Sequence, residues 1–410
     1  MSEPHAYSLI ESIVAAGNAY EQGDTGARES LLALSHALIA RLEMPSEFMQ
    51  RSFWAEPAKS AICRIAVDLN IFQYLEDAGK AGLDFEELAA MTGSQLGLIE
   101  RLMRHLVSTK VLTITDGKLH CTTLSNGLSE EKYRDSIVWV DDISRPLFNQ
   151  LPEYLRSTSY REPLSATDGP FQHHFKTTRS FYDWKDATPQ YEKLHKSLMS
   201  SFRAGKPDWF MPGYYPVAER LVNGFDEDNG EALLVDIGGN RGDELRRFVE
   251  HHSEHPGKLV LEDLDAVLSA VDTEKTLPFE ICAHDFFKPQ PVKGARAYYL
   301  HSILHNWNDE DSLRILENIK PALKPGYSRV LINEIAISDE NPSLSGSTLD
   351  ILMMTNCGSL ERTEGHWKSL LEKAGLKVRY IYSHPEAAES IIEAELPAQG
   401  VATGSAVVIG

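Results

Sequence analysis

The sequence predicts an α/β protein in which a mainly parallel, seven-stranded sheet, covered by helices on both faces, follows a mainly helical domain with a winged-helix pattern. Two observations predict this fold class. From residue 232 onward, apolar segments of strand length alternate with helical segments such as residues 310–323 and 363–375, which is typical of parallel sheets. In the first part, apolar residues recur at helical spacing until two short strands flank the turn-forming pair Asp116-Gly117.

The predicted sheet is built from segments whose length and apolar content suit buried strands. These segments are residues 232–239, 258–264, 279–287, 295–304, 328–337, 376–384 and 404–410. Connections between parallel strands are right-handed, and ligands of such sheets bind at the carboxyl ends of the strands. We therefore expect the functional residues at the strand ends.

Length and charge limit the possible classes of protein. A chain of 410 residues exceeds one typical core, and we place two domains at residues 1–190 and 191–410. The net charge of −20 argues against a general binder of nucleic acid or anionic membranes, because both attract basic surfaces. No segment approaches the roughly 20 consecutive apolar residues of a membrane helix, and no signal peptide is recognisable.

The cysteine pattern bears on the cellular compartment. The chain has four widely spaced cysteines and no CxxC pair: Cys63, Cys121, Cys282 and Cys357. This spacing argues against a disulfide framework or a zinc knuckle and fits a reducing compartment. We therefore expect a cytoplasmic protein.

The helical domain has the order of a winged helix. We expect helices over residues 30–48, 61–79, 84–90 and 96–106. The first of them should close at Pro45, and the second should be largely buried. A hairpin at Asp116-Gly117 then follows the helix–turn–helix pair. A winged helix allows a DNA-binding function, but the candidate recognition helix carries Glu100 beside its basic residues, so a structural or dimerising role is the preferred interpretation.

The middle of the chain, residues 140–200, has no clean period and is rich in aromatic residues. We expect loops and short helices that help to build a pocket, followed by a helix over residues 190–205 that carries Met199.

The first predicted strand ends in a glycine-rich turn. The turn carries an acid and three glycines: Asp236, Gly238, Gly239 and Gly242. Glycines let a ligand approach the backbone, and the following helix offers free N–H groups. Asp263 ends the second strand, where a carboxylate can accept both hydroxyls of a ribose. Taken alone, the turn is a weak signal, because Asn240 stands where a dinucleotide fingerprint would have its middle glycine.

Later strand ends carry further polar and aromatic residues. Asp285 and Phe286 end the third strand and suit the amino group and the face of adenine. His305 and Trp307 follow the fourth strand, Glu334 ends the fifth, and Glu361 precedes a helix.

These motifs, in this order, resemble the class I S-adenosylmethionine-dependent O-methyltransferases of the caffeate and small-phenol type, in particular the fungal members of secondary metabolism. The resemblance rests on "FWAEPAKSAICRIAVDLNIFQYL" and the winged helix in the first half, and on "VDIGGNRGDEL", "LEDL", "HDFF", "LHNWNDED" and "LERTEGHW" in the second. It implies a Rossmann-like S-adenosylmethionine-binding domain, a dimerising N-terminal domain, a homodimer and a small-molecule acceptor. Neither nucleic acid nor a membrane is implied as a partner.

The resemblance also implies a mechanism. His305 matches the general base, and Glu334 and Glu361 match its two supporting carboxylates, an arrangement suited to taking a proton from a phenolic or enolic hydroxyl. No metal is required, although these three residues could in principle form a metal site. The acceptor would be walled by Met199 and Trp307.

The cofactor residues carry over from the same motifs. The glycine turn would face the methionine end of S-adenosylmethionine, Asp263 the ribose, and Asp285 with Phe286 the adenine. His301 stands where the family has a lysine or arginine that helps to hold the cofactor. Asn306, which follows the general base where Asp is usual, and Asn240 are further departures from the family.

Three functions remain after this comparison. The first is O-methyl transfer to a phenolic or enolic natural product. The second is a non-methylating reaction, pericyclic or dehydrating, in which the bound sulfonium acts only by its charge. The third is DNA-binding regulation.

Overall fold

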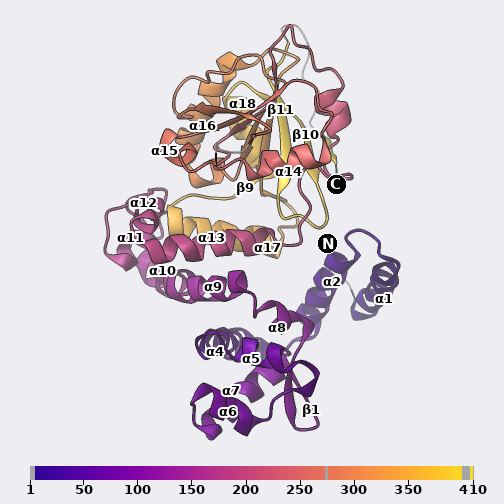
Figure 1. Cartoon of the computed structure of the whole chain (residues 1–410), viewed down its shortest axis with the longest axis vertical. Coiled ribbons are helices and arrows are strands. Elements are labelled where there is room, and N and C mark those ends of the chain that lie inside the picture. The colour runs from indigo at the N-terminus through magenta and orange to yellow at the C-terminus, as the bar shows by residue number, and fades with distance from the viewer. Residues whose placement is uncertain (1–4, 273–275, 399–406, 410) are drawn as a thin grey trace. The chain divides into compact units, whose positions relative to one another are not determined.

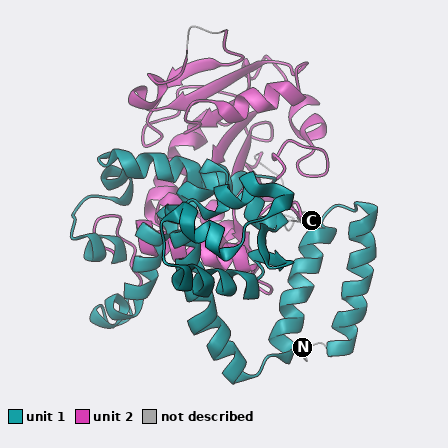
Figure 2. Ribbon diagram, turned by 60° about the horizontal axis from the view of Figure 1, so that its bottom comes forward, with its two compact units in different colours: residues 1–161, 170–205 teal, residues 162–169, 206–410 magenta. Residues whose placement is uncertain are grey.

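The computed structural model describes residues 5–272, 276–398 and 407–409. The chain forms two compact units, one of residues 1–161 and 170–205 and the other of residues 162–169 and 206–410 (Figure 2). The predicted division between residues 190 and 191 falls inside helix α13 (Pro189–Arg203).

The first unit is mainly helical (Figure 1). Before the hairpin its helices are α1 (Ala6–Gln22), α2 (Ala27–Leu42), α3 (Pro45–Gln50), the π-helical turn η1 (Arg51–Ala55), α4 (Glu56–Asp68), α5 (Ile71–Ala78), the 3-10 turn η2 (Gly79–Ala81), α6 (Phe85–Thr92) and α7 (Leu96–Ser108). After it come α8 (Thr123–Gly127), α9 (Glu131–Trp139), the π-helical turn η3 (Val140–Ser144), α10 (Arg145–Ser157), α11 (Pro170–Phe175), α12 (Phe181–Asp186) and α13.

The predicted helix–turn–helix and hairpin are present. Strands β1 (Leu112–Thr115) and β2 (Lys118–Cys121) pair antiparallel around Asp116 and Gly117. Both turn residues have positive φ, 50° and 76°, as the two-residue turn of a twisted hairpin requires. Helices α4 to α7 and both strands share one buried apolar cluster, so the winged helix has its own core.

The helices differ from the prediction in two details. The segment 61–79 is divided between α4 and α5, because Asn70 adopts a left-handed conformation with φ 54° and ends the run. The first predicted helix ends at Leu42, three residues before Pro45, and Pro45 itself begins a further helix, α3, where its missing N–H costs no hydrogen bond.

The second unit contains the predicted mainly parallel sheet. Its strands are β3 (Ala232–Ile237), β4 (Lys258–Asp263), β5 (Glu280–Ala283), β6 (Ala297–His301), β7 (Arg329–Glu334), β10 (Lys377–Ser383), β11 (Ser390–Glu395) and β12 (Val407–Ile409), in the spatial order β12-β10-β11-β7-β6-β3-β4-β5. Among the strands in the described part of the sheet, only β11 runs antiparallel to its neighbours. Two short strands, β8 (Ala336–Ile337) and β9 (Arg362–Thr363), pair beside the sheet.

Six of the seven predicted strands correspond to β3 to β7 and β10, and the seventh is the segment 404–410. Strand β11, between β10 and β7, was not predicted. Of residues 404–410 only β12 lies within the described part, at the edge of the sheet beside β10. Because β11 is antiparallel, its first residue, Ser390, pairs with Glu334 at the carboxyl end of β7.

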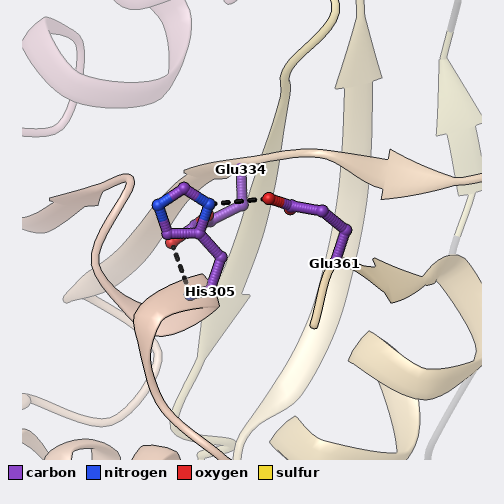
Figure 3. A group of neighbouring side chains, drawn as sticks. All are labelled: His305, Glu334 and Glu361. Carbon is purple, nitrogen blue, oxygen red and sulfur yellow. Dashed lines mark hydrogen bonds and ion pairs between the residues drawn. The ribbon is translucent and has the colours of Figure 1, made fainter. Parts of the chain in front are cut away.

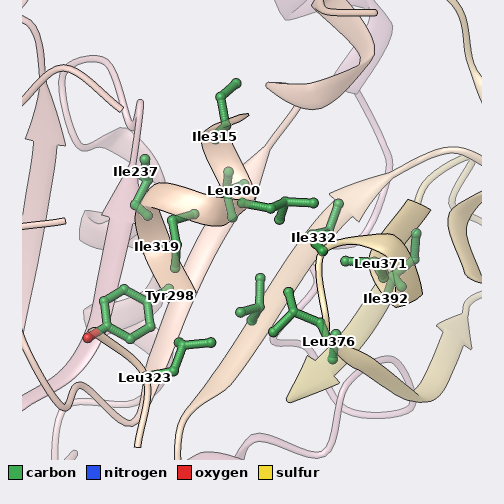
Figure 4. Close-up of a cluster of buried hydrophobic side chains, with 14 of the residues drawn as sticks. Ile237, Tyr298, Leu300, Ile315, Ile319, Leu323, Ile332, Leu371, Leu376 and Ile392 are labelled. Atoms are coloured by element: carbon green, nitrogen blue, oxygen red, sulfur yellow. The ribbon is translucent and has the colours of Figure 1, made fainter. Parts of the chain in front are cut away.

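Helices cover both faces of the sheet and bury its apolar side chains. The helices in the described part of this unit are η4 (Ala218–Val222), α14 (Asp243–His251), α15 (Asp265–Leu268), η5 (Leu304–Asn306), α16 (Asp309–Ile319), η6 (Lys320–Ala322), α17 (Leu344–Cys357) and α18 (Glu364–Lys373). One core joins the sheet to α16 and α18 (Figure 4). The opposite core joins it to η4, α14 and α15. Among the helices of the described residues, none is long and apolar enough to cross a membrane.

Candidate active site

His305, Glu334 and Glu361 come together at the carboxyl edge of the sheet. His305 lies in the short turn η5, which follows β6. Glu334 is the last residue of β7, the parallel neighbour of β6, and Glu361 immediately precedes β9. Parallel strands end at the same edge, so residues far apart in the sequence meet there.

The histidine ring points toward both carboxylates (Figure 3). Its Nδ1 lies 2.7 Å from Oε1 of Glu361 and 3.6 Å from Oε2 of Glu334. Both glutamates are almost fully buried. Of the two ring nitrogens only Nδ1 has a hydrogen-bond partner among the described residues, which leaves Nε2 to face a ligand.

Glu334 also orders the turn that carries His305. Its Oε1 accepts hydrogen bonds from the backbone N–H groups of Ile303 and Leu304, each at 2.8 Å, and from that of His305 at 3.4 Å. One buried carboxylate thus holds three consecutive amides and leaves its second oxygen toward the imidazole. The position of His305 is therefore set by main-chain hydrogen bonds as well as by its own side chain.

Charge in the site favours the imidazolium. Burial lowers the pKa of His305, but the carboxylates of Glu334 and Glu361 outweigh burial and raise it to about 9. Burial raises the pKa of Glu334. A histidine with two buried carboxylates at Nδ1 is thus a strong proton acceptor at Nε2, with a fixed orientation.

The same three residues have metal-ligating atoms within 4.8 Å of one another. However, Nδ1 of His305 already makes a 2.7 Å hydrogen bond to Glu361, and Glu334 accepts three amide hydrogen bonds. These contacts suit a proton-transfer group and need no ion.

Arg362, which was not among the predicted site residues, also holds the turn of His305. Its side chain is fully buried and donates to the backbone carbonyls of Leu304, at 3.0 Å, and Trp307, at 2.9 Å. Nε of Arg362 also donates to Asp309 at 2.9 Å. The residue lies in the motif "LERTEGHW", directly after Glu361, but a single arginine in a motif does not reveal which carbonyls it reaches.

The glycine turn follows β3 at the same edge. Gly238 and Gly242 have φ of 73° and 74°, and Asn240 has φ 55°. Asn is among the few residues that adopt this conformation readily, so Asn240 keeps the backbone path that a glycine would take.

Close packing explains why glycines occupy this turn. A Cβ atom on Gly239 would lie 2.4 Å from Oδ2 of Asp236 and 2.6 Å from Cδ1 of Leu261. A Cβ atom on Gly238 would lie 2.6 Å from Cδ1 of Ile303 and 4.0 Å from Phe286. The turn therefore packs against a residue within β4 and residues that follow β5 and β6, and any side chain would intrude between them.

Asp263 is oriented by the glycine turn. Its Oδ2 accepts a hydrogen bond from the backbone N–H of Asn240 at 2.9 Å, and its Oδ1 accepts from that of Leu264 at 2.7 Å. Burial raises the pKa of Asp263, and these two N–H groups oppose that rise. The carboxylate is thus fixed beside the turn and keeps acceptor capacity for a diol.

The predicted adenine residues lie on the neighbouring loop after β5. Asp285 accepts a hydrogen bond from the backbone N–H of Phe287 at 2.9 Å. Trp307 packs edge-on against Phe287, with ring centroids 4.8 Å apart, and lies 6.1 Å from Phe286. These rings form one aromatic group beside the glycine turn.

His301 and Met199 have surroundings that the sequence did not reveal. His301, the last residue of β6, lies between the carboxylates of Glu244 and Glu389. Met199 lies on α13 in the first unit and is 43% exposed. Every other predicted site residue belongs to the second unit.

This architecture, a glycine turn beside a buried His–Glu–Glu centre at the edge of a mainly parallel sheet, is that of a methyltransferase. Residues 216–377 match the O-methyltransferase domain family, and residues 56–134 match the O-methyltransferase dimerisation domain. O-methyltransferase mpaG of Penicillium brevicompactum is 48% identical over 97% of this chain and 100% of its own length. O-methyltransferase mfmE of Annulohypoxylon moriforme is 32% identical over 95% of each chain.

The chain therefore belongs to the O-methyltransferase family that carries this dimerisation domain, and it is an S-adenosylmethionine-dependent O-methyltransferase of the kind found in fungal secondary metabolism. The predicted family, fold and cofactor are confirmed. Solved structures that are similar include "A Pericyclic Reaction enzyme", with a TM-score of 0.82 and 27% identity over 96% of this chain and 100% of that one. A complex of LepI with S-adenosylmethionine has the same TM-score and identity over 95% of this chain and 99% of that one.

Proposed function

We propose that the enzyme methylates a phenolic or enolic hydroxyl and that Nε2 of His305 takes the proton of that hydroxyl. The observation that supports this role most strongly is the 2.7 Å contact between Nδ1 of His305 and the buried carboxylate of Glu361. A carboxylate at Nδ1 fixes the tautomer and stabilises the imidazolium formed when Nε2 gains a proton. A neutral phenol, with an ordinary pKa of about 10, needs such a base at neutral pH.

The residues of the glycine turn fit S-adenosylmethionine. Gly238 and Gly239 leave no room for side chains, so the backbone itself would face the ligand, and the fixed carboxylate of Asp263 suits two ribose hydroxyls. Phe286, close to Gly238, offers an apolar ring to the adenine, with Asp285 for its amino group. The bound sulfonium supplies an activated methyl group, and the protein positions the acceptor oxygen and removes its proton.

Trp307 is proposed to line the acceptor pocket. Trp307 follows the turn of His305 by two residues and packs on Phe287, so its ring lies near both proposed sites. Replacing Trp307 with Ala should raise KM for the acceptor more than it changes the affinity for S-adenosylhomocysteine.

The experiment that tests the proposed function uses S-adenosylmethionine with a deuterated methyl group and a panel of phenols and enols. We expect one labelled methyl group on oxygen in the product, a loss of about 10²–10⁴-fold in rate for His305→Ala, and unchanged binding of S-adenosylhomocysteine. Full activity of His305→Ala would overturn the role of the base.

One observation favours a second candidate function. The likeness to a pericyclic reaction enzyme extends over nearly the whole chain, and that protein shares this fold. In a non-methylating reaction the product would have the mass of the substrate, and S-adenosylmethionine would not be consumed. The mass of the product therefore separates the two functions.

We further propose that the enzyme works as a homodimer in the cytoplasm. The dimerisation-domain match at residues 56–134 supports the dimer, as do exposed apolar side chains just before it, including Phe53 at 59% and Trp54 at 71% exposure. The four cysteines are all free thiols, which supports a reducing compartment. Light scattering on wild type and on a Phe53→Ser/Trp54→Ser variant tests the dimer, and a fluorescent fusion tests the location.

A further inference from the structure

A second buried histidine lies between two carboxylates at the same edge of the sheet. Nδ1 of His301 lies 2.6 Å from Oε2 of Glu244, and Nε2 lies 3.1 Å from Oε2 of Glu389. The side chain of His301 is 9% exposed. Both ring nitrogens are therefore engaged by acids, unlike those of His305.

The two carboxylates come from elements that flank the cofactor turn and β7. Glu244 lies in the first turn of α14, two residues after Gly242, and its other oxygen accepts a hydrogen bond from the Tyr299 hydroxyl at 2.7 Å. Glu389 directly precedes β11, and its other oxygen accepts from the Ser302 hydroxyl at 3.3 Å. His301 thus connects the loop before β11 to the start of α14.

The same stretch of backbone leads to His305. Ser302 has φ 53° and donates its N–H to the carbonyl of Asn333 at 3.2 Å, and the Asn306 side chain donates to the carbonyl of Ser302 at 3.0 Å. Three residues separate the two histidines, and this folded turn joins them.

The charges of this second group act on the first. Glu389 raises the pKa of both His305 and Glu334, whereas His301 lowers the pKa of Glu334. Burial lowers the pKa of His301, but Glu244 and Glu389 outweigh burial and raise it to about 10, so at neutral pH it is a cation.

We propose that Glu244, His301 and Glu389 form a second charged cluster that sets the charge of the His305 centre, with the His301 cation offsetting the Glu389 carboxylate. In this role His301 is a positioning residue. The effect of the cluster on catalysis rests on the proposed function, because the charge of His305 decides how much of the imidazole is free to take a proton.

Further titratable groups among the described residues lie around the cluster. Tyr299 of β6 and Tyr214 lie near the acids, and Lys206 attracts Glu389 from the segment before η4. Glu334, at the end of β7, faces His301 from the side of the catalytic centre. Because these residues are kept in every variant below, the changes isolate the pair formed by His301 and Glu389.

The test measures the titration of the His305 imidazole by NMR in the cofactor-free enzyme, which requires no turnover. In Glu389→Gln the midpoint should fall by about one pH unit, because a carboxylate that favours the imidazolium is lost. In His301→Gln it should rise by about one pH unit, because Glu389 is no longer offset. The double variant His301→Gln/Glu389→Gln should titrate near wild type. His301→Lys, which keeps the positive charge, should keep the wild-type midpoint. The exposed change Glu372→Gln is the control.

Catalysis gives the second measurement. The acid limb of the kcat profile should move in the same direction as the midpoint, so His301→Gln should lose about tenfold in kcat at the foot of that limb. Movement of the midpoint without any methyl transfer would support the cluster and reject the proposed function. If His301→Gln does not fold, the titration midpoints of Glu389→Gln and of the double variant still test the proposal. Midpoints that fall in both single variants, or do not move, would overturn the proposal, because loosened packing would then be the only role.

Discussion

Replacing Glu361 with Gln is the most informative change within the proposed catalytic centre. The variant keeps the size of the side chain but removes the charge 2.7 Å from Nδ1 of His305. The rise in the pKa of His305 from 6.5 to about 9 corresponds to roughly 3 kcal/mol in favour of the imidazolium. Glu334, with an oxygen 3.6 Å from Nδ1, shares in this effect, so we expect the pKa of His305 to fall by about 1 to 2.

The assay is a pH titration of the imidazole signals of His305 by NMR, assigned with His305→Asn. Glu372→Gln, an exposed change on α18, is the matched control and should leave the titration unchanged. We also expect kcat to fall by about 10²-fold, because the imidazolium formed during proton transfer loses its partner. A wild-type titration midpoint in Glu361→Gln would refute the electrostatic reasoning.

Three further predictions concern stability, the glycine turn and metals. The folded-state pKa of His305 lies above its unfolded value, so the imidazolium stabilises the fold fully below pH 6.5 and this contribution is lost as pH rises through about 9. In denaturant titrations, the free energies of unfolding of wild type and His305→Asn should therefore converge over this window. Gly239→Ala should destabilise the fold by about 1–3 kcal/mol and weaken binding of S-adenosylhomocysteine in calorimetry, since its Cβ would lie 2.4 Å from Asp236, whereas Gly17→Ala, with nothing within 4 Å, should do neither. Treatment with EDTA should leave methyl transfer unchanged, and a loss restored by a divalent ion would reveal a metal at the His–Glu–Glu centre.

Sequence patterns were sufficient for most of the fold. Alternating strands and helices, each with a distinct apolar period, predicted the sheet, and Asp116-Gly117 predicted the hairpin because only certain residues adopt positive φ at both positions. Strand β11 has the sequence "SIIEAE" and was not predicted, because it is a short segment that follows a loop and no helical crossover of the parallel type precedes it. The break at Asn70 was missed because both flanking segments are apolar and helical, so periodicity continues across it.

The candidate site was predictable only where motifs at strand ends carry it. His305 and Glu334 were found at the ends of strands and Glu361 in a motif that precedes a helix, and the structure brings the three together. Glu244 and Glu389 were not found. Nothing in a helix's first turn or in a loop before an antiparallel strand shows which histidine the acid will reach. Long-range side-chain partners of this kind depend on the order of strands in the sheet.

The central claim is that this chain transfers a methyl group to an acceptor oxygen through the His305 base. The measurement that tests it most directly is mass spectrometry of the product formed from an accepted phenol or enol with deuterated S-adenosylmethionine, for wild type and His305→Ala side by side. The account predicts one labelled methyl group on oxygen with wild type and almost none with His305→Ala, while both bind S-adenosylhomocysteine equally. A product of unchanged mass, or an equal yield from both enzymes, would contradict it.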